Sequence, residues 1–159
     1  MNIAPPDPAI ETLKREVATR LGFMVMEFSR LEMELGLVLH WADEGRNAAE
    51  MALRLRRANF NDRLKMLRDQ LARDPDSHPD YRAWVAEANH ARKLRNRLIH
   101  GRWGFHGPDA PAPVSNVRGD PWSDELIEVD TTLPELDAQL AQLKALRRRL
   151  AQLRESSPL

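Results

Sequence analysis

One long apolar stripe near the N-terminus constrains the fold more than any other feature of this sequence. Between residues 8 and 43, large apolar side chains recur at steps of three and four, the spacing of one helix face. At about 1.5 Å per residue, such a helix is about 50 Å long. It cannot bury its stripe alone, so it is the spine of a bundle, a dimer interface, or both. The stripe comprises Ile10, Leu13, Val17, Leu21, Met24, Phe28, Leu31, Leu35, Val38 and Ala42.

Helical patterns also dominate the rest of the chain. Further helices are predicted over residues 48–58, 60–73, 79–100 and 134–155, and the first two of these could instead form one kinked helix. Short strands are predicted at residues 102–106, 114–118 and 126–129. The predicted fold class is therefore mostly α. We expect an antiparallel four- to five-helix bundle with a small β-hairpin or extended insertion before the last helix.

Length and composition indicate a single domain over residues 1–159. Its parts are a tail at residues 1–6, an insertion at 102–130 and a second tail at 156–159. The chain has no cysteine, which excludes disulfides and thiol chemistry and fits a reducing compartment. It has neither a signal-peptide pattern at its start nor an apolar run of about 20 residues. We therefore expect a cytoplasmic protein without membrane contact.

Basic charge is concentrated mid-chain although the formal net charge is zero. The segment from Arg54 to Arg73 contains seven Lys or Arg residues and only two acids, Asp62 and Asp69. The segment from Arg82 to Arg102 contains six Lys or Arg residues and only one acid, Glu87. Two interpretations stay open: an anion-binding surface formed by neighbouring helices, or solvated helix faces.

The second basic segment contains one charge in an unusual place. On a helical wheel, Arg95 points into an apolar arc formed by Trp84, Ala88, Ala91, Leu94, Leu98 and Ile99. A charge aimed at a core is costly unless it is paired. Glu32 is the acid nearest the buried edge of the first helix and is the candidate partner, unless it simply faces water. Glu27 and Glu34 lie on the other flank and are expected to be solvated.

Several chemistries lack their motifs. There is no glycine-rich phosphate loop, no nucleophile elbow, and no inward-facing pair of Glu-x-x-His motifs. The five histidines show no metal-ligand spacing, so no metal or other cofactor is expected.

The end of the basic helix carries the remaining candidate chemistry. His100 can transfer a proton near neutral pH, and Arg95 can bind a phosphate and stabilise developing negative charge. Asn96 lies one turn before His100, where the two can share a hydrogen bond, and it can orient either the imidazole or a phosphate. Arg95 and His100 diverge by about 140° on an ideal helix. They converge only at a distorted helix end or across a two-fold axis.

The segment Arg95-Asn96-Arg97-Leu98-Ile99-His100 resembles the Arg-x4-His motif of the HEPN superfamily. The following Gly101-Arg102-Trp103 is similar to a continuation seen in some members, and Phe28-Ser29-Arg30-Leu31-Glu32 also looks like that group. These are small helical proteins of prokaryotic toxin–antitoxin, phage-defence and RNA-processing systems. The specific likeness covers only about ten residues.

The resemblance implies a metal-independent endoribonuclease in which the ribose 2′-hydroxyl attacks the adjacent phosphate. The implied catalytic residues are Arg95, Asn96 and His100, in a composite site at the interface of a homodimer. Implied partners are RNA and an antitoxin protein. Residues expected to support the site or contact substrate are Glu32, Arg92, Arg97 and Arg102.

The alternative is a non-catalytic helical module of the same type that binds a partner protein or nucleotide. In that case Arg95 pairs inside the bundle and His100 caps the helix end. Trp103, Phe105 and Trp122 either stack on bases or cover the end of the bundle.

Overall fold

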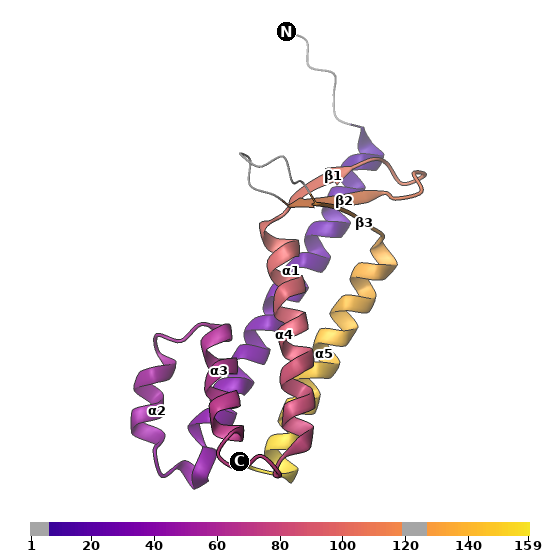
Figure 1. The fold of residues 1–159 in the computed structure, drawn as a ribbon. Coiled ribbons are helices and arrows are strands. Elements are labelled where there is room, and N and C mark those ends of the chain that lie inside the picture. The colour runs from indigo at the N-terminus through magenta and orange to yellow at the C-terminus, as the bar shows by residue number, and fades with distance from the viewer. Residues whose placement is uncertain (1–6, 119–126) are drawn as a thin grey trace. The chain divides into compact units, whose positions relative to one another are not determined.

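The computed structural model describes residues 7–118 and 127–159, and most of the chain is helical (Figure 1). This confirms the predicted mostly α class with a small β insertion before the last helix. The predicted tail at residues 1–6 and Trp122 lie outside the described residues. In chain order the elements are α1 (Pro8–His40), a 3-10 turn (Ala42–Gly45), α2 (Ala48–Leu55), α3 (Phe60–Leu71), α4 (Pro79–His100), β1 (Arg102–Phe105), β2 (Val114–Arg118), β3 (Ile127–Thr131) and α5 (Leu133–Ser156).

Local backbone chemistry sets the helix ends. Asp43 and Glu44 adopt left-handed φ angles of 53° and 58°, so the first helix stops at His40 rather than near residue 43. Asn59 and Asp62 form a reciprocal capping box, which begins α3 and makes it a helix separate from α2. Thr132 and Glu135 bond in the same reciprocal way at the start of α5.

The described chain forms two compact units, each assembled from segments far apart in sequence. Among the described residues, the first unit comprises residues 7–25, 94–118 and 127–141, and the second comprises residues 26–93 and 142–159. Helices α1, α4 and α5 each contribute one segment to each unit, whereas α2 and α3 belong to the second unit alone.

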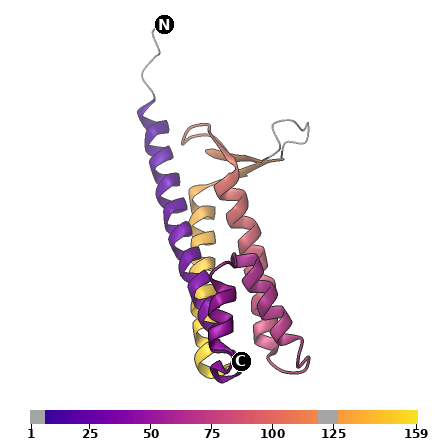
Figure 2. The same cartoon turned by 90° about the vertical axis from the view of Figure 1, so that its left-hand side faces the viewer.

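The core of the second unit joins α1, α3, α4 and α5. Leu31, Leu64, Trp84 and Leu150 are fully buried there. The indole Nε1 of Trp84 donates to the carbonyl oxygen of Leu146 at 2.9 Å, so the largest core side chain also satisfies its polar atom. Helix α2 lies beside α3 (Figures 1 and 2), and its apolar residues are either partly buried or exposed.

The core of the first unit lies under the sheet. It contains Leu13 and Val17 of α1, Leu98 of α4, Val114 of β2 and Leu136 of α5. The half-buried side chains of Trp103 and Phe105 pack against the same cluster. These two aromatic residues therefore cover a core.

The sheet is antiparallel with strand order β1-β2-β3. Trp103 pairs with Asn116, so both side chains share the face that carries Val114. Ser115 pairs with Gly104 on one side and Asp130 on the other, which places these three on the opposite face. The register thus directs one polar side chain, Asn116, toward the core, where it is 2% exposed.

Arg63 of α3 holds the helices of the second unit together. Its guanidinium donates to the carbonyl oxygens of Glu32, Ala58 and Leu55 at 2.8, 3.3 and 3.4 Å. A side chain at Gly36 would approach Arg63 Nη1 to 3.2 Å, so glycine there leaves the guanidinium its room. One arginine therefore ties α1, the end of α2 and the start of α3 to each other.

Candidate functional site

The predicted motif occupies the last turns of α4, which ends at His100 as the sequence predicts. Arg95 and Asn96 are half-buried, and the imidazole of His100 is exposed. Arg95 Nη1 donates to Asn96 Oδ1 at 3.1 Å, which fixes the direction of the guanidinium. No hydrogen bond joins Asn96 to His100 among the described residues. The asparagine therefore orients the arginine, while the histidine faces solvent.

The other predicted site residues belong to both units. Arg92 bonds within its own helix, with Nε and Nη2 donating to Asn89 Oδ1 at 3.2 and 3.0 Å. The side chain of Arg97 is half-buried, and Arg102 is exposed at the start of β1. Arg92 belongs to the second unit, whereas Arg97 and Arg102 belong to the first.

Glu32, the predicted partner of Arg95, already has a cation beside it. Its carboxylate lies 3.8 Å from Arg63 Nε, and its carbonyl oxygen accepts from the same arginine. Glu32 lies in the second unit and Arg95 in the first. The sequence could not tell whether Arg63 or Arg95 lies beside Glu32, because both arginines lie on helices other than that of Glu32.

The prediction that Glu27 and Glu34 face water is wrong. Glu27 is 5% exposed and accepts from Arg147 Nε at 3.0 Å and from Arg30. Burial would raise the pKa of its carboxyl, but the two guanidinium hydrogen bonds outweigh burial and lower that pKa below 4.5. Glu34 is 3.4 Å from Arg154. Residues from α5 cover this flank of α1, and a single-helix wheel contains no information about that contact.

A residue that sequence reasoning missed, Asn116 of β2, supports the end of the motif helix. With its amide oriented to satisfy both groups, Nδ2 donates to the carbonyl oxygen of Arg97 at 3.1 Å, and Oδ1 accepts from Trp103 Nε1 at 3.3 Å. The same indole also donates to the carbonyl oxygen of Leu98 at 3.0 Å. The indole thus satisfies a helix-end carbonyl, and Asn116 adds a second bond to the carbonyl oxygen of Arg97, which also accepts from the backbone N–H of Gly101 at 2.9 Å.

Gly101 is required by this arrangement. A side-chain carbon there would stand 2.1–2.5 Å from the amide of Asn116, closer than any non-bonded contact allows. The glycine is needed here for the room that it leaves to a buried asparagine, since its φ is not left-handed. The only sequence signal of Asn116 is its place, with Ser115, between Val114 and Val117 of a predicted strand.

A second polar pair lies on the other face of the sheet. His106 Nε2 and Ser115 Oγ are 3.0 Å apart, and Gly104 leaves the space beside the hydroxyl open. Ser115 is only 1% exposed, because the strands and His106 cover it. A buried hydroxyl cannot reach a substrate, so this pair is a satisfied structural contact.

Within the described ranges, no group of three or more His, Asp or Glu residues is placed to hold a metal ion. No helix in the part of the chain that the structure describes is long and apolar enough to cross a membrane. At the end of α4 the structure presents an oriented guanidinium and an exposed imidazole.

No protein-family model, curated protein or solved structure matches this chain. The likeness to the HEPN superfamily accordingly stays a resemblance carried by the motif residues.

Proposed function

We propose that this protein is a metal-independent endoribonuclease of the HEPN type that acts as a toxin or phage-defence component. The observation that carries the proposal is the exposed imidazole of His100, which follows an Arg95 guanidinium oriented by Asn96 at 3.1 Å. An exposed proton-transfer group and an oriented phosphate-binding group are what this reaction requires.

In the proposed reaction the ribose 2′-oxygen attacks the adjacent phosphorus, and the bond from phosphorus to the 5′-oxygen breaks. His100 takes the proton of the 2′-hydroxyl, and the imidazolium so formed gives a proton to the leaving 5′-oxygen. Arg95 stabilises the negative charge that develops on the phosphorane oxygens. Asn96 positions Arg95. The products carry a 2′,3′-cyclic phosphate and a 5′-hydroxyl.

The proposal places two copies of the motif at one interface, because Arg95 and His100 diverge on one helix and the arginine of one chain can meet the histidine of the other. Met26 and Met33 support self-association, since they are 49% and 58% exposed and lie two turns apart on α1. Large apolar side chains exposed on one side of a helix are typical of interfaces.

The deciding experiment is incubation of purified protein with structured RNA in EDTA. We expect cleavage whose products carry cyclic phosphate ends by mass spectrometry. Arg95→Ala and His100→Ala should each lower the rate about 100-fold or more. His90→Ala is the matched control, because His90 is exposed on the same helix outside the motif.

The proposal fails if the wild-type protein leaves several RNAs intact, or if His100→Ala cleaves as fast as the wild type. The first result would favour the non-catalytic module that binds a protein or nucleotide. Replacing the ribose at the cut site with deoxyribose must abolish cleavage, since the attacking hydroxyl is then missing.

A further inference from the structure

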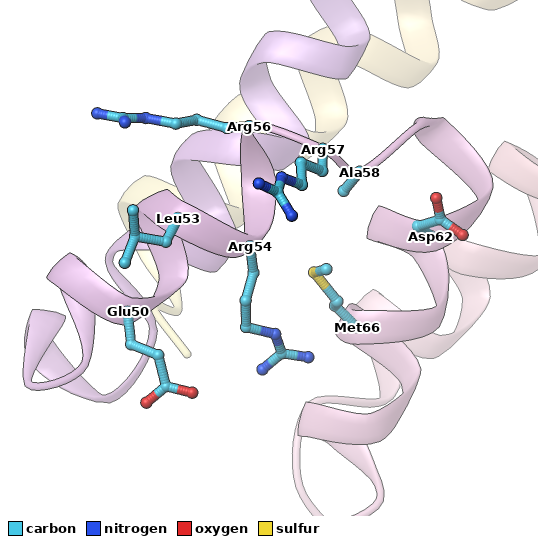
Figure 3. A pocket seen from close by; sticks show the side chains of 8 residues that line it. All are labelled: Glu50, Leu53, Arg54, Arg56, Arg57, Ala58, Asp62 and Met66. Carbon is cyan, nitrogen blue, oxygen red and sulfur yellow. The ribbon is translucent and has the colours of Figure 1, made fainter.

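An open groove lies between α2 and α3 in the second unit (Figure 3). It is separate in sequence from the motif at the end of α4. Its lining residues are Glu50, Leu53, Arg54, Arg56, Arg57, Ala58, Asp62 and Met66.

The arginines of this groove lack an acidic partner within residues 7–118 and 127–159. Arg54 and Arg57 lie over the space between the two helices, and Arg56 extends away from it (Figure 3). None of the three forms an ion pair among the described residues. Guanidinium groups without a counter-ion at a concave surface form a site for an anion.

One acid of the groove is already engaged. Asp62 Oδ2 accepts from the backbone N–H of Asn59 at 3.1 Å as part of the capping box. Glu50 is exposed one turn before Arg54. The groove therefore keeps an excess of positive charge in a protein whose net charge is zero.

The groove also has an apolar part. Leu53 is 63% exposed, and Met66 is half-buried where α3 faces α2. An exposed leucine and a polarisable thioether give an unstacked base or a ribose an apolar surface to lie on. Arg63 donates to the carbonyl oxygens of Ala58 and Leu55 and so holds the end of α2 beside the start of α3.

We propose that this groove binds the sugar-phosphate backbone of single-stranded RNA. Arg54 and Arg57 are one helical turn apart, so their guanidiniums reach the same phosphate or two neighbouring ones. Leu53 and Met66 contact an adjacent base, which must be unstacked and hence single-stranded. The inference rests on the proposed ribonuclease function and gives its substrate a second point of attachment.

Fluorescence anisotropy with a labelled single-stranded RNA tests the groove. The His100→Ala background keeps the RNA intact. Adding Arg54→Ala and Arg57→Ala should weaken binding about tenfold or more and reduce the slope of log affinity against log salt by about 1.4. Arg15→Ala with Arg148→Ala removes the same charge at exposed arginines outside the groove and should change neither value comparably.

Equal losses in the groove variant and the control variant would overturn the inference, as would unchanged binding in both. Displacement of RNA by polyglutamate at equal charge concentration would also overturn it, by indicating an acidic protein as the occupant. Failure here is distinguishable from failure of the proposed function. Groove-dependent RNA binding without cleavage by the wild type contradicts the ribonuclease alone, and cleavage without groove dependence contradicts the groove alone.

Discussion

At the scale of single residues, two buried titratable side chains determine how the stability of this protein should depend on pH. Glu27 is a buried carboxylate held by two guanidiniums, Arg30 of its own helix and Arg147 of α5. Tyr81 presents the opposite case, because its hydroxyl is buried without a hydrogen-bond partner in the part of the chain that the structure describes. The two residues respond to pH in different ranges.

Glu27→Gln should lower the free energy of unfolding at pH 7 by about 1–3 kcal/mol, because a charged acceptor is lost from two hydrogen bonds. The folded state favours the ionised carboxylate, so this contribution is present above pH 4.5 and is lost as pH falls through the lower folded pKa. Urea titrations at pH 7 and pH 3 measure it, and the deficit should shrink at pH 3. Glu155→Gln on the exposed end of α5 serves as the control.

Tyr81 should ionise only at high pH, since burial raises the pKa of its phenol to about 12 and the positive charge of Arg154 lowers that pKa only in part. Between pH 10 and pH 12 the unfolded chain loses this proton while the folded chain keeps it, so unfolding becomes easier as pH rises. It is the only tyrosine, so absorbance at 295 nm reports it alone. A midpoint near 10 with native circular dichroism would contradict the burial.

At the scale of elements, a side-chain hydrogen bond joins strand β2 to the end of α4. Asn116 bonds the carbonyl oxygen of Arg97, and Gly101 leaves room for its amide. The geometry of the proposed site therefore depends on a strand that begins fourteen residues after His100.

Gly101→Ala should destabilise the protein by about 1–3 kcal/mol, because the new methyl group overlaps the amide of Asn116. Adding Asn116→Ala should remove part of that cost, since the overlapping atoms are gone. Thermal unfolding of the two single variants and the double variant measures the coupling. Additive losses would show that the two residues do not touch.

The helices were predictable because their apolar residues follow a helical period, and their ends because proline, asparagine and glycine mark them. The contacts between helices were not predictable in this way. A single wheel places Glu32 at the buried edge and Glu27 on the solvated flank, whereas the neighbouring helices decide that Arg147 covers Glu27 and that Arg63 lies beside Glu32. Asn116 was missed because a polar residue in a short strand carries no signal of which face is buried.

At the scale of the whole molecule, the proposed composite site predicts how a mixture of two inactive variants should behave. Arg95→Ala and His100→Ala are each expected to be inactive. A mixed dimer holds one intact arginine and one intact histidine, so mixing the two variants should restore part of the wild-type cleavage rate. Cleavage assays after dissociation and reassociation measure it.

No recovery despite verified exchange of subunits would indicate that each chain builds its site alone. Light scattering of the wild type must show a dimer under the same conditions. Met33→Glu places a charge on an exposed methionine of α1 and tests whether that surface contributes to the dimer.

The bonds made by Arg63 also have a dynamic consequence. Helix α2 is eight residues long and contains no fully buried residue, so it is too short to persist without support. It should open and close while the rest of the second unit stays folded, and its amides should exchange with solvent before those of α3. Removing Arg63 would accelerate that exchange, and a ligand seated between α2 and α3 would slow it. Hydrogen exchange therefore reports occupancy of the groove even where no cleavage occurs.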